Sequence, residues 1–522
     1  MIVASSTLLL TALSVSCIRQ DTARTDAIVI SVRSNVGPLD PAVSPDTEQL
    51  QIIFPAYDNL VSITSDPETG EDVFHPEIAS SWTVSPDRLV WTFTLSDRYV
   101  FDSGRRVDAE AVKFTFDRLM AISRGPSSSL KEAVGTVEVL SPQTVRFTLK
   151  RPLPSFLPLI ADRAMFIIDP GVMTHEIDGD HASQWLSTHS AGSGPYRLVK
   201  HSPRDVYILE PNPFRPDPPR QIQKIIYKVA NDPSVRALQL AKGDIDLAYF
   251  LPAELIGPFR EDPRYRVDVI SSPAMNFLAF NMERPALADR RLREAVAHAI
   301  DYEAIVRDIK YGLAEEFRGP LLPGMIGYRP DEYPYAYDPE KARELVASLR
   351  RDGPLPEMTL IYPGVSAASD TMAIFIQSSL AASGIDLKLQ RLTVPAVIDR
   401  IQRGNYDLLF MGWVSAYGDP SNIMNVWFDP KYKGGSGNYA RYENPEVTEL
   451  LAKSLSEGDP QIRASLLRQS VDQVNRDLPY VYLVKNAVWT VASSRLQGLS
   501  FDQYNLFDQD FHLMTLTEDE TP

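Results

Sequence analysis

The chain has 522 residues, which is long enough for two or three domains with sizeable cores. Hydrophobic residues make up 44% and charged residues 23%, a balance typical of soluble globular proteins. The formal net charge of −16 disfavours a nucleic-acid partner, because such a partner requires a basic face. We therefore predict a soluble protein with no nucleic-acid partner.

The N-terminus predicts export and lipid attachment. Residues 1–16 are uncharged and largely apolar, which suits the apolar region of a signal peptide and is too short for a membrane-spanning helix. Ser16 precedes Cys17, the one cysteine of the chain, as at the cleavage site of a bacterial lipoprotein. The segment departs from that pattern, since it has no Lys or Arg and has Ser14 where Leu is usual.

An incidental cysteine is the alternative. We predict a signal peptide over 1–16, lipidation of Cys17 and a polar tether over 17–26. The mature protein is then extracytoplasmic and anchored to a membrane.

The first half of the chain mixes strands and helices. Ile28–Arg33 reads as a strand, and Leu89–Leu95 and Thr144–Leu149 alternate between apolar and polar residues, which is typical of half-buried strands. Asp108 is a candidate N-cap for a helix with an apolar stripe at Val112, Phe116 and Leu119. These elements indicate an α+β region up to about residue 270.

The second half has a repeating order. After an amphipathic helix at Leu292–Ile300, three strands alternate with two helices, and glycines end the helices. The strands are Thr359–Tyr362, Ile385–Gln390 and Tyr406–Trp413, and the helices are Asp370–Ser383 and Val394–Arg403. This βαβαβ order predicts parallel strands covered by helices. Ligands of such sheets collect at the carboxyl ends of strands, here near Tyr362 and Trp413.

Enzymatic signatures are missing from the sequence. None of the seven histidines forms an H-E-x-x-H pair, and there is no Walker A loop and no G-x-G-x-x-G after a strand. "GSGPY" lacks the G-x-S-x-G nucleophile pattern. The "HEIDGDH" segment is more typical of a solvated turn than of a metal site. The sequence therefore predicts no catalytic residues, no metal and no cofactor.

Several separated segments together resemble one family. They are "LDPAVSPDT", "PEIASSWTVSPDRLVWTFTL", "GSGPYRLV", "LQLAKGDIDLA", "LAFNMERPALADRRLREAVAHAIDYEAIV" and "MGWVSAYGDPSN". In this order they resemble the extracytoplasmic solute-binding proteins, family 5, of peptide/nickel-type ABC importers. The resemblance covers nearly the whole mature chain.

The resemblance implies an α/β, two-lobed periplasmic-binding-protein-like fold of type II. It belongs to the large cluster with an extra subdomain in the first lobe, and its ligand cleft lies between the lobes. The first lobe is expected over 27–274 plus 487–517 and the second lobe over 275–486. Met275–Asn281 and the strand near Lys485 are the expected hinge crossings. The implied function is that of a monomeric receptor that captures a solute by hinge closure and docks on an ABC permease.

One departure from the family concerns the ligand. In peptide-binding members, the Trp that corresponds to Trp413 is followed three residues later by an Asp that pairs with the peptide ammonium. Here that position is Ala416, and Asp419 belongs to a Gly-Asp-Pro turn, where turn chemistry is its expected role. The Arg that dipeptide binders carry near Ser369–Thr371 is also missing.

We therefore consider a non-peptide solute, such as a sugar or a modified peptide, against an aromatic wall of Trp413 and Tyr417. The alternative keeps a peptide that is held by its backbone, with its amine paired elsewhere, for example by Asp419.

Three further wall residues and two further function classes remain open. Tyr362 is a candidate because it ends a strand, and Asn35 and Tyr57 are candidates by family position, although core packing or capping would explain the latter two equally well. A secreted hydrolase would need a nucleophile or an acid pair in the cleft. A sensory receptor would use the same fold without transport.

Overall fold

The computed structural model describes residues 25–33, 37–43, 47–66, 71–124, 126–215, 221–415, 418–434, 437–501 and 509–517. The predicted signal peptide and the predicted site residues Cys17, Asn35, Ala416 and Tyr417 lie outside these ranges. Within them, no helix is both long and apolar enough to cross a membrane.

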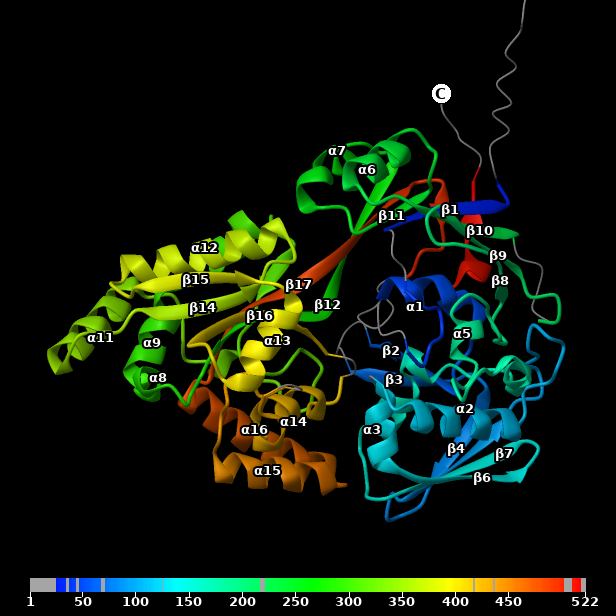
Figure 1. Ribbon diagram of the computed structural model, residues 1–522, viewed down its shortest axis with the longest axis horizontal. Coiled ribbons are helices and arrows are strands. Elements are labelled where there is room, and N and C mark those ends of the chain that lie inside the picture. Colours follow the sequence, from blue (N-terminus) through cyan, green and yellow to red (C-terminus); the bar gives the residue numbers. More distant parts are fainter. Residues whose placement is uncertain are drawn as a thin grey trace, which may run out of the picture.

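An eleven-stranded mixed sheet runs through both halves of the molecule (Figure 1). In spatial order its strands are β15 (Leu387–Leu392), β14 (Met358–Pro363), β16 (Leu408–Val414), β12 (Tyr265–Phe280), β17 (Tyr480–Ser493), β11 (Leu247–Tyr249), β1 (Ala27–Val32), β10 (Lys224–Val229), β9 (Val206–Pro211) and β8 (Tyr196–Ser202), with β13 (Ala314–Glu316) paired to β17. The long strands β12 and β17 form the ribbon that joins the two halves.

The ladder between β12 and β17 shifts register at two places, between Ser271 and Met275 and between Asn276 and Phe277, and the first of them is the wider break. Ser271 pairs with Ala487 and Met275 with Lys485, so the residues between them break the register. Such a bulge bends a strand pair and weakens it locally. The predicted lobe boundaries, 274/275 and 486/487, fall at this break.

Different hydrophobic cores lie on the two sides of the break. One cluster draws its buried residues only from 275–484. The other three clusters draw theirs from the first-lobe ranges, with Leu313 as the one exception among the described residues.

The βαβαβ prediction for the second half is confirmed. Strands β14, β15 and β16 are parallel, and helices α12 (Ala367–Ala382) and α13 (Val394–Arg403) connect them. Helix α12 begins three residues before the predicted start because the Ser366 side chain accepts the Ser369 N–H and caps it. The other α-helices of this lobe are α8 (Pro285–Ala288), α9 (Arg290–Ala299), α10 (Tyr302–Ala304), α11 (Pro339–Asp352), α14 (Ser421–Phe428), α15 (Pro445–Ser456) and α16 (Pro460–Asp477).

A separate four-stranded antiparallel sheet forms the lower part of the first lobe (Figure 1). Its order is β4 (Ala79–Val84), β5 (Val90–Leu95), β7 (Thr144–Leu149) and β6 (Val134–Ser141). Helix α2 (Ala109–Ile122) packs on it through Phe116, whose ring centroid is 4.8 Å from that of Phe147, and Asp108 caps the helix as predicted.

The remaining elements of the first lobe are short. They are β2 (Val61–Ser65), β3 (Asp72–Pro76), β18 (Leu496–Gln497), β19 (Thr515–Leu516), α1 (Thr47–Ile53), α3 (Pro126–Ala133), α4 (Phe156–Ile160), α5 (Ser183–Leu186), α6 (Pro233–Ala241) and α7 (Gly257–Arg260).

Candidate functional site

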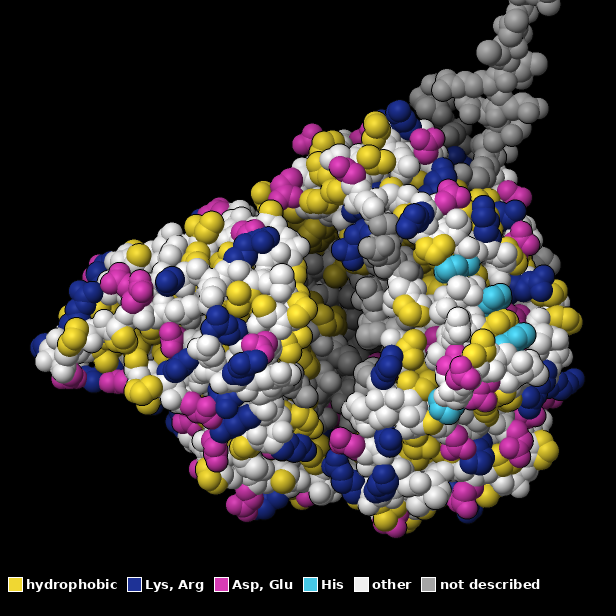
Figure 2. All heavy atoms as spheres, in the orientation of Figure 1, with side chains coloured by type: hydrophobic (Ala, Val, Ile, Leu, Met, Phe, Trp, Pro, Cys, Tyr) yellow, Lys and Arg dark blue, Asp and Glu magenta, His cyan; other side chains and the backbone are white. Residues whose placement is uncertain are grey.

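Two groups of strand ends point toward each other across the molecule. Strands β1, β10 and β11 are parallel to one another and to β12, so they run from the first lobe toward the second. Strands β14, β15 and β16 run the opposite way, because β16 is antiparallel to β12. Figure 2 shows a deep hollow between the two halves. Since the carboxyl ends of parallel strands are the usual ligand-binding edge, this hollow is the candidate site.

Trp413 lies at the end of β16 and is half-buried. Its ring meets the rings of Trp427 and Tyr439 edge-on, with centroid distances of 6.1 and 6.4 Å. The indole nitrogen is buried and has no hydrogen-bond partner within the described part of the chain. Trp413 therefore has one side fixed in the second-lobe core and a hydrogen-bond donor that the described residues do not use.

Tyr362 lies at the end of β14 and is almost fully buried. Burial raises the pKa of Tyr362, with a further contribution from its contact to Asp370. The neighbouring strand places Arg391 opposite Tyr362, and Arg391 donates to Asp370 and to the Gly364 carbonyl, each at 2.9 Å. An arginine therefore does stand at this edge, although it comes from β15 and is already paired with a carboxylate.

Asp419 is engaged by the protein itself. One of its carboxylate oxygens accepts the Ser421 N–H at 2.9 Å and a hydrogen bond from the Arg463 guanidinium at 2.8 Å. Both side chains of this ion pair are buried, with 8% and 6% exposed for Asp419 and Arg463. These contacts favour the interpretation that Asp419 stabilises the turn over the interpretation that it binds the ligand directly.

Lys310 lies beside the same edge and carries no sequence motif that marks it. It follows a π-helical turn, Ile305–Ile309, and its ammonium donates to Oδ1 of Asn276 at 3.1 Å. Asn276 pairs with Gly412 across β12 and β16, two residues before β16 ends at Val414. Burial lowers the pKa of Lys310 from 10.5 to about 8.

This pKa shift predicts a specific pH dependence. We expect the free energy of unfolding of the wild type, relative to that of Lys310→Met, to rise as the pH increases from about 8 to 10.5. Below this range Lys310 is protonated in both states; within it the unfolded chain binds more protons, so rising pH favours the folded state. Urea unfolding of both proteins over this range measures the difference in their free energies of unfolding. The tyrosines that titrate in this range contribute equally to both proteins, so their effect drops out of the difference. A difference that does not change with pH would contradict the burial of the ammonium.

The first-lobe side of the hollow contributes Arg33 and Phe250, which follow β1 and β11. The Arg33 guanidinium carbon lies 4.8 Å from the centre of the Phe250 ring, a cation–π contact. Phe250 has a positive φ of 56°, which is unusual for a bulky residue and is typical of positions fixed by their surroundings.

Tyr57 is placed elsewhere, in the core of the first lobe. It is almost fully buried, its hydroxyl accepts the Ala191 N–H at 3.1 Å, and its ring stacks on Phe166 at 5.4 Å. Burial raises the pKa of Tyr57. These contacts favour the packing alternative for Tyr57.

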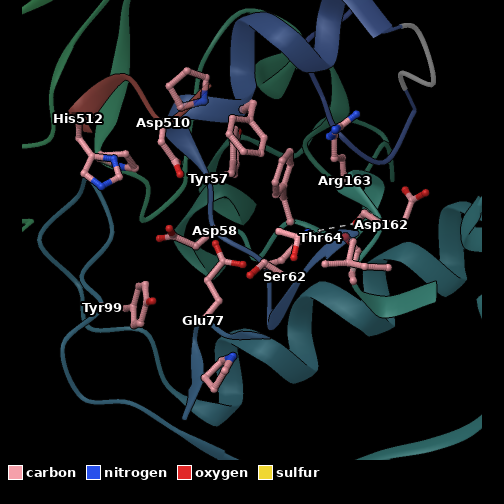
Figure 3. A pocket seen from close by; sticks show the side chains of 18 of the residues that line it. Tyr57, Asp58, Ser62, Thr64, Glu77, Tyr99, Asp162, Arg163, Asp510 and His512 are labelled. Atoms are coloured by element: carbon pink, nitrogen blue, oxygen red, sulfur yellow. Dashed lines mark hydrogen bonds between the residues drawn. The ribbon is translucent and has the colours of Figure 1, made fainter. Parts of the chain in front are cut away.

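Tyr57 also lines a cavity of 490 Å³ whose walls come only from first-lobe residues (Figure 3). Asp58 and Glu77 lie close together there, and burial, reinforced by the charge of Asp58, raises the pKa of Glu77. Asp58 is held by Arg215 at 2.6 Å and by the Ser193 hydroxyl at 2.6 Å. One side of the cavity is thus polar, and its charged side chains are paired with other residues of the protein. The cavity is separate from the strand ends described above.

A comparison with known protein families agrees with this architecture. The profile of the bacterial extracellular solute-binding proteins, family 5 (middle region), matches residues 73–435. The chain belongs to this family. As a family 5 solute-binding protein it acts outside the cytoplasm by binding a solute, and the family prediction from the sequence is confirmed.

Similar family 5 proteins extend the match beyond the profile. The probable D,D-dipeptide-binding periplasmic protein DdpA of Escherichia coli K12 is 32% identical over 494 residues, which is 94% of each chain. The glutathione-binding protein GsiB of Salmonella paratyphi A is 25% identical over 488 residues, or 90% of this chain and 91% of GsiB. The structure of DppA from Helicobacter pylori with the peptide STSA superimposes with a TM-score of 0.78 at 25% identity, covering 94% of this chain and 98% of DppA. The predicted periplasmic-binding-protein fold is therefore confirmed.

Proposed function

We propose that this family 5 protein captures a short peptide in the hollow between its lobes and delivers it to an ABC permease. The observation that carries the proposal is the 32% identity to a probable D,D-dipeptide-binding protein along nearly the whole of both chains. A D,D-dipeptide is therefore the first ligand to test.

The edge of β16 supports a peptide ligand. Strand β14 pairs with β16 only at Leu408 and Leu409, so among the described strands the Phe410–Val414 stretch has a ladder partner on its β12 side alone. Val414 is 61% exposed at this edge. An extended peptide can add to such an edge through main-chain hydrogen bonds, which do not require the acid that is missing at Ala416.

Mass spectrometry of the solute that co-purifies from the native host tests this proposal. Peptides of two to five residues are the expected finding. A sugar or another non-peptide solute would instead favour the second candidate, whose support is the absence of an acid at Ala416. A hydrolase finds no support in the relatives, which are binding proteins.

Closure of the lobes around the ligand is part of the proposal, with the break in the β12–β17 ladder as its hinge. A contact far from the hinge spans the two lobes: Arg88, in the turn between β4 and β5, donates to the carbonyl of Gly458, between α15 and α16, at 2.9 Å. The two lobes are thus already in contact at this place, and we propose that the closed state keeps this hydrogen bond.

We expect Arg88→Gly to weaken ligand binding about two- to tenfold, since one such hydrogen bond contributes about 0.5–1.5 kcal/mol. Arg88 has a φ of 56°, which glycine adopts freely, so the ligand-free protein should not lose stability. Calorimetric titration measures the affinity, and Arg151→Ala, at an exposed position of the same lobe, is the control. Equal affinity in wild type and Arg88→Gly would show that the contact does not contribute to the closed state.

We further propose that the signal peptide over 1–16 is removed, that Cys17 is lipidated and that the receptor is a monomer. The apolar segment before Cys17 supports the first two of these proposals. Mass spectrometry of the N-terminal fragment from membranes is expected to show a diacylated Cys17, and an unmodified Cys17 would contradict the anchor.

A further inference from the structure

A further cavity lies in the second lobe, away from the strand ends that form the candidate site. Its volume is 280 Å³, and its lining residues lie within 301–337 and at Tyr482 of β17. Pockets for drug-sized ligands measure about 300–1,000 Å³, so this cavity suits a smaller molecule. Because all of these lining residues belong to the second lobe, the cavity does not depend on closure of the lobes.

Aromatic side chains make up more than half of the lining residues. They are Tyr302, Phe317, Tyr333, Tyr335, Tyr337 and Tyr482. The hydroxyls of Tyr302 and Tyr335 donate to main-chain carbonyls at 2.8 and 3.1 Å. The ring of Tyr333 meets those of Tyr335 and Tyr482 at 71° and 65°, with centroid distances of 5.3 and 5.4 Å. These contacts hold the rings in place before a ligand binds.

The lining of the cavity carries more negative than positive charge. Three lining residues, Asp301, Glu303 and Glu316, are acidic, and one, Arg318, is basic. Arg318 pairs with Glu316 at 2.7 Å, whereas the side chain of Glu303 is 81% exposed and its contact to Arg307 is long, at 3.8 Å. Aromatic rings attract a cation through their faces, and nearby carboxylates add to this attraction. The cavity therefore suits a positively charged ligand.

The Tyr482 hydroxyl adds an unsatisfied polar group to this cavity. The residue is 1% exposed, and its hydroxyl has no hydrogen-bond partner within the described part of the chain. Burial raises the pKa of Tyr482, so the hydroxyl keeps its proton. A buried hydroxyl without a partner costs stability, and a ligand with a polar hydrogen can satisfy its oxygen.

We propose that this cavity binds a small organic ammonium ion, whose charge lies against the tyrosine rings and carboxylates and whose polar hydrogen is donated to the Tyr482 hydroxyl. Aromatic sites of this kind suit alkylated ammonium groups, since the rings attract the charge without forming hydrogen bonds to it. The cation binds in addition to the solute in the hollow between the lobes. The proposal does not rest on the peptide function, because it uses none of the residues to which we assign the peptide.

Choline and its uncharged isostere 3,3-dimethyl-1-butanol test the proposal. The two molecules have nearly the same shape and the same hydroxyl, and only choline carries a charge. We expect calorimetric titration of the wild type to show saturable binding of one choline per chain, about tenfold or more tighter than binding of the isostere. No saturable binding of choline, or equal affinity for both molecules, would overturn the proposal.

Variants of two exposed lining residues place the choline in this cavity. Tyr337 is 47% exposed, so Tyr337→Leu should unfold at the wild-type temperature and bind choline about three- to tenfold more weakly, whereas Tyr337→Phe keeps the ring and most of the affinity. Glu303→Gln should weaken choline binding about two- to fivefold. Glu344→Gln is its matched control, because Glu344 is also exposed and lies 3.8 Å from Lys341. Unchanged affinity in Tyr337→Leu, or equal losses in the two Gln variants, would contradict the location.

The contact with the Tyr482 hydroxyl is tested by Tyr482→Phe, which removes that hydroxyl alone. The ligand-free variant should unfold at the temperature of the wild type or above it, since an unsatisfied polar group has been removed. We expect choline to bind this variant about two- to tenfold more weakly, as for the loss of one hydrogen bond. Tetramethylammonium has no hydroxyl and should bind wild type and variant equally. Equal choline affinity in both proteins would reject the assigned hydrogen bond.

Discussion

Replacing Asp419 by alanine is expected to lower the free energy of unfolding by about 3–5 kcal/mol, because removing one partner of a buried ion pair leaves the other charge uncompensated. The charge left behind is Arg463, which among the described residues would keep its hydrogen bond to the Ser454 carbonyl at 3.1 Å and lose its carboxylate partner. The turn would also lose the hydrogen bond from the Ser421 N–H. Urea unfolding followed by circular dichroism measures the change.

The double variant Asp419→Ala/Arg463→Met distinguishes the two roles considered for Asp419. It removes both charges, so most of the lost stability should return. We expect this variant to bind its ligand as the wild type does, since the structure assigns the carboxylate to the turn and to Arg463. A stable double variant with at least tenfold weaker binding would instead make Asp419 a ligand residue.

Replacing Trp427 by alanine is expected to cost about 3–5 kcal/mol of stability, the usual cost of removing a large aromatic side chain from a core. Trp427 is fully buried, and the ring centroids of Phe277 and Tyr480 lie 4.7 and 5.0 Å from its own. Its ring also supports Trp413 at the candidate site, at 6.1 Å. We therefore expect weaker ligand binding as well, by about two- to tenfold for one lost aromatic pair.

Trp427→Phe is the control for this prediction. The indole nitrogen of Trp427 is buried without a hydrogen-bond partner in the described structure, so phenylalanine loses volume and no hydrogen bond. Its cost should be well below that of alanine, and ligand binding should change little. If alanine and phenylalanine variants unfold at the same urea concentration, the packing around Trp427 does not carry the stability assigned to it.

Local sequence patterns predicted the second lobe well, because residues within or next to each strand and helix mark where it begins and ends. The alternation of Ile385–Gln390 and the glycine that ends Val394–Arg403 correspond to β15 and α13 within two residues. The start of α12 was missed because Ser366 lies outside the apolar pattern and acts only through its side-chain cap. The single sheet through both lobes could not be read from the sequence, since β12 and β17 pair over about 200 residues.

The candidate site was predicted only in part for the same reason. The predicted strand ends indicated Trp413 and Tyr362, but Ala416, Tyr417 and Asn35 lie outside the described residues. Lys310 has no local signal, because its meaning comes from burial and from Asn276, 34 positions away. Tyr57 and Asp419 were identified by their positions in the sequence. Their contacts could not be predicted, because their partners Ala191 and Arg463 lie in distant segments of the chain.

The central claim is that this family 5 protein is a receptor for short peptides. Calorimetric titration of the ligand-free wild type with D-alanyl-D-alanine and with a mixture of two- to five-residue L-peptides tests it most directly. We predict saturable binding of a free peptide with one peptide per chain. No binding of any peptide, by a folded protein that does bind a non-peptide solute from its host, would contradict the claim.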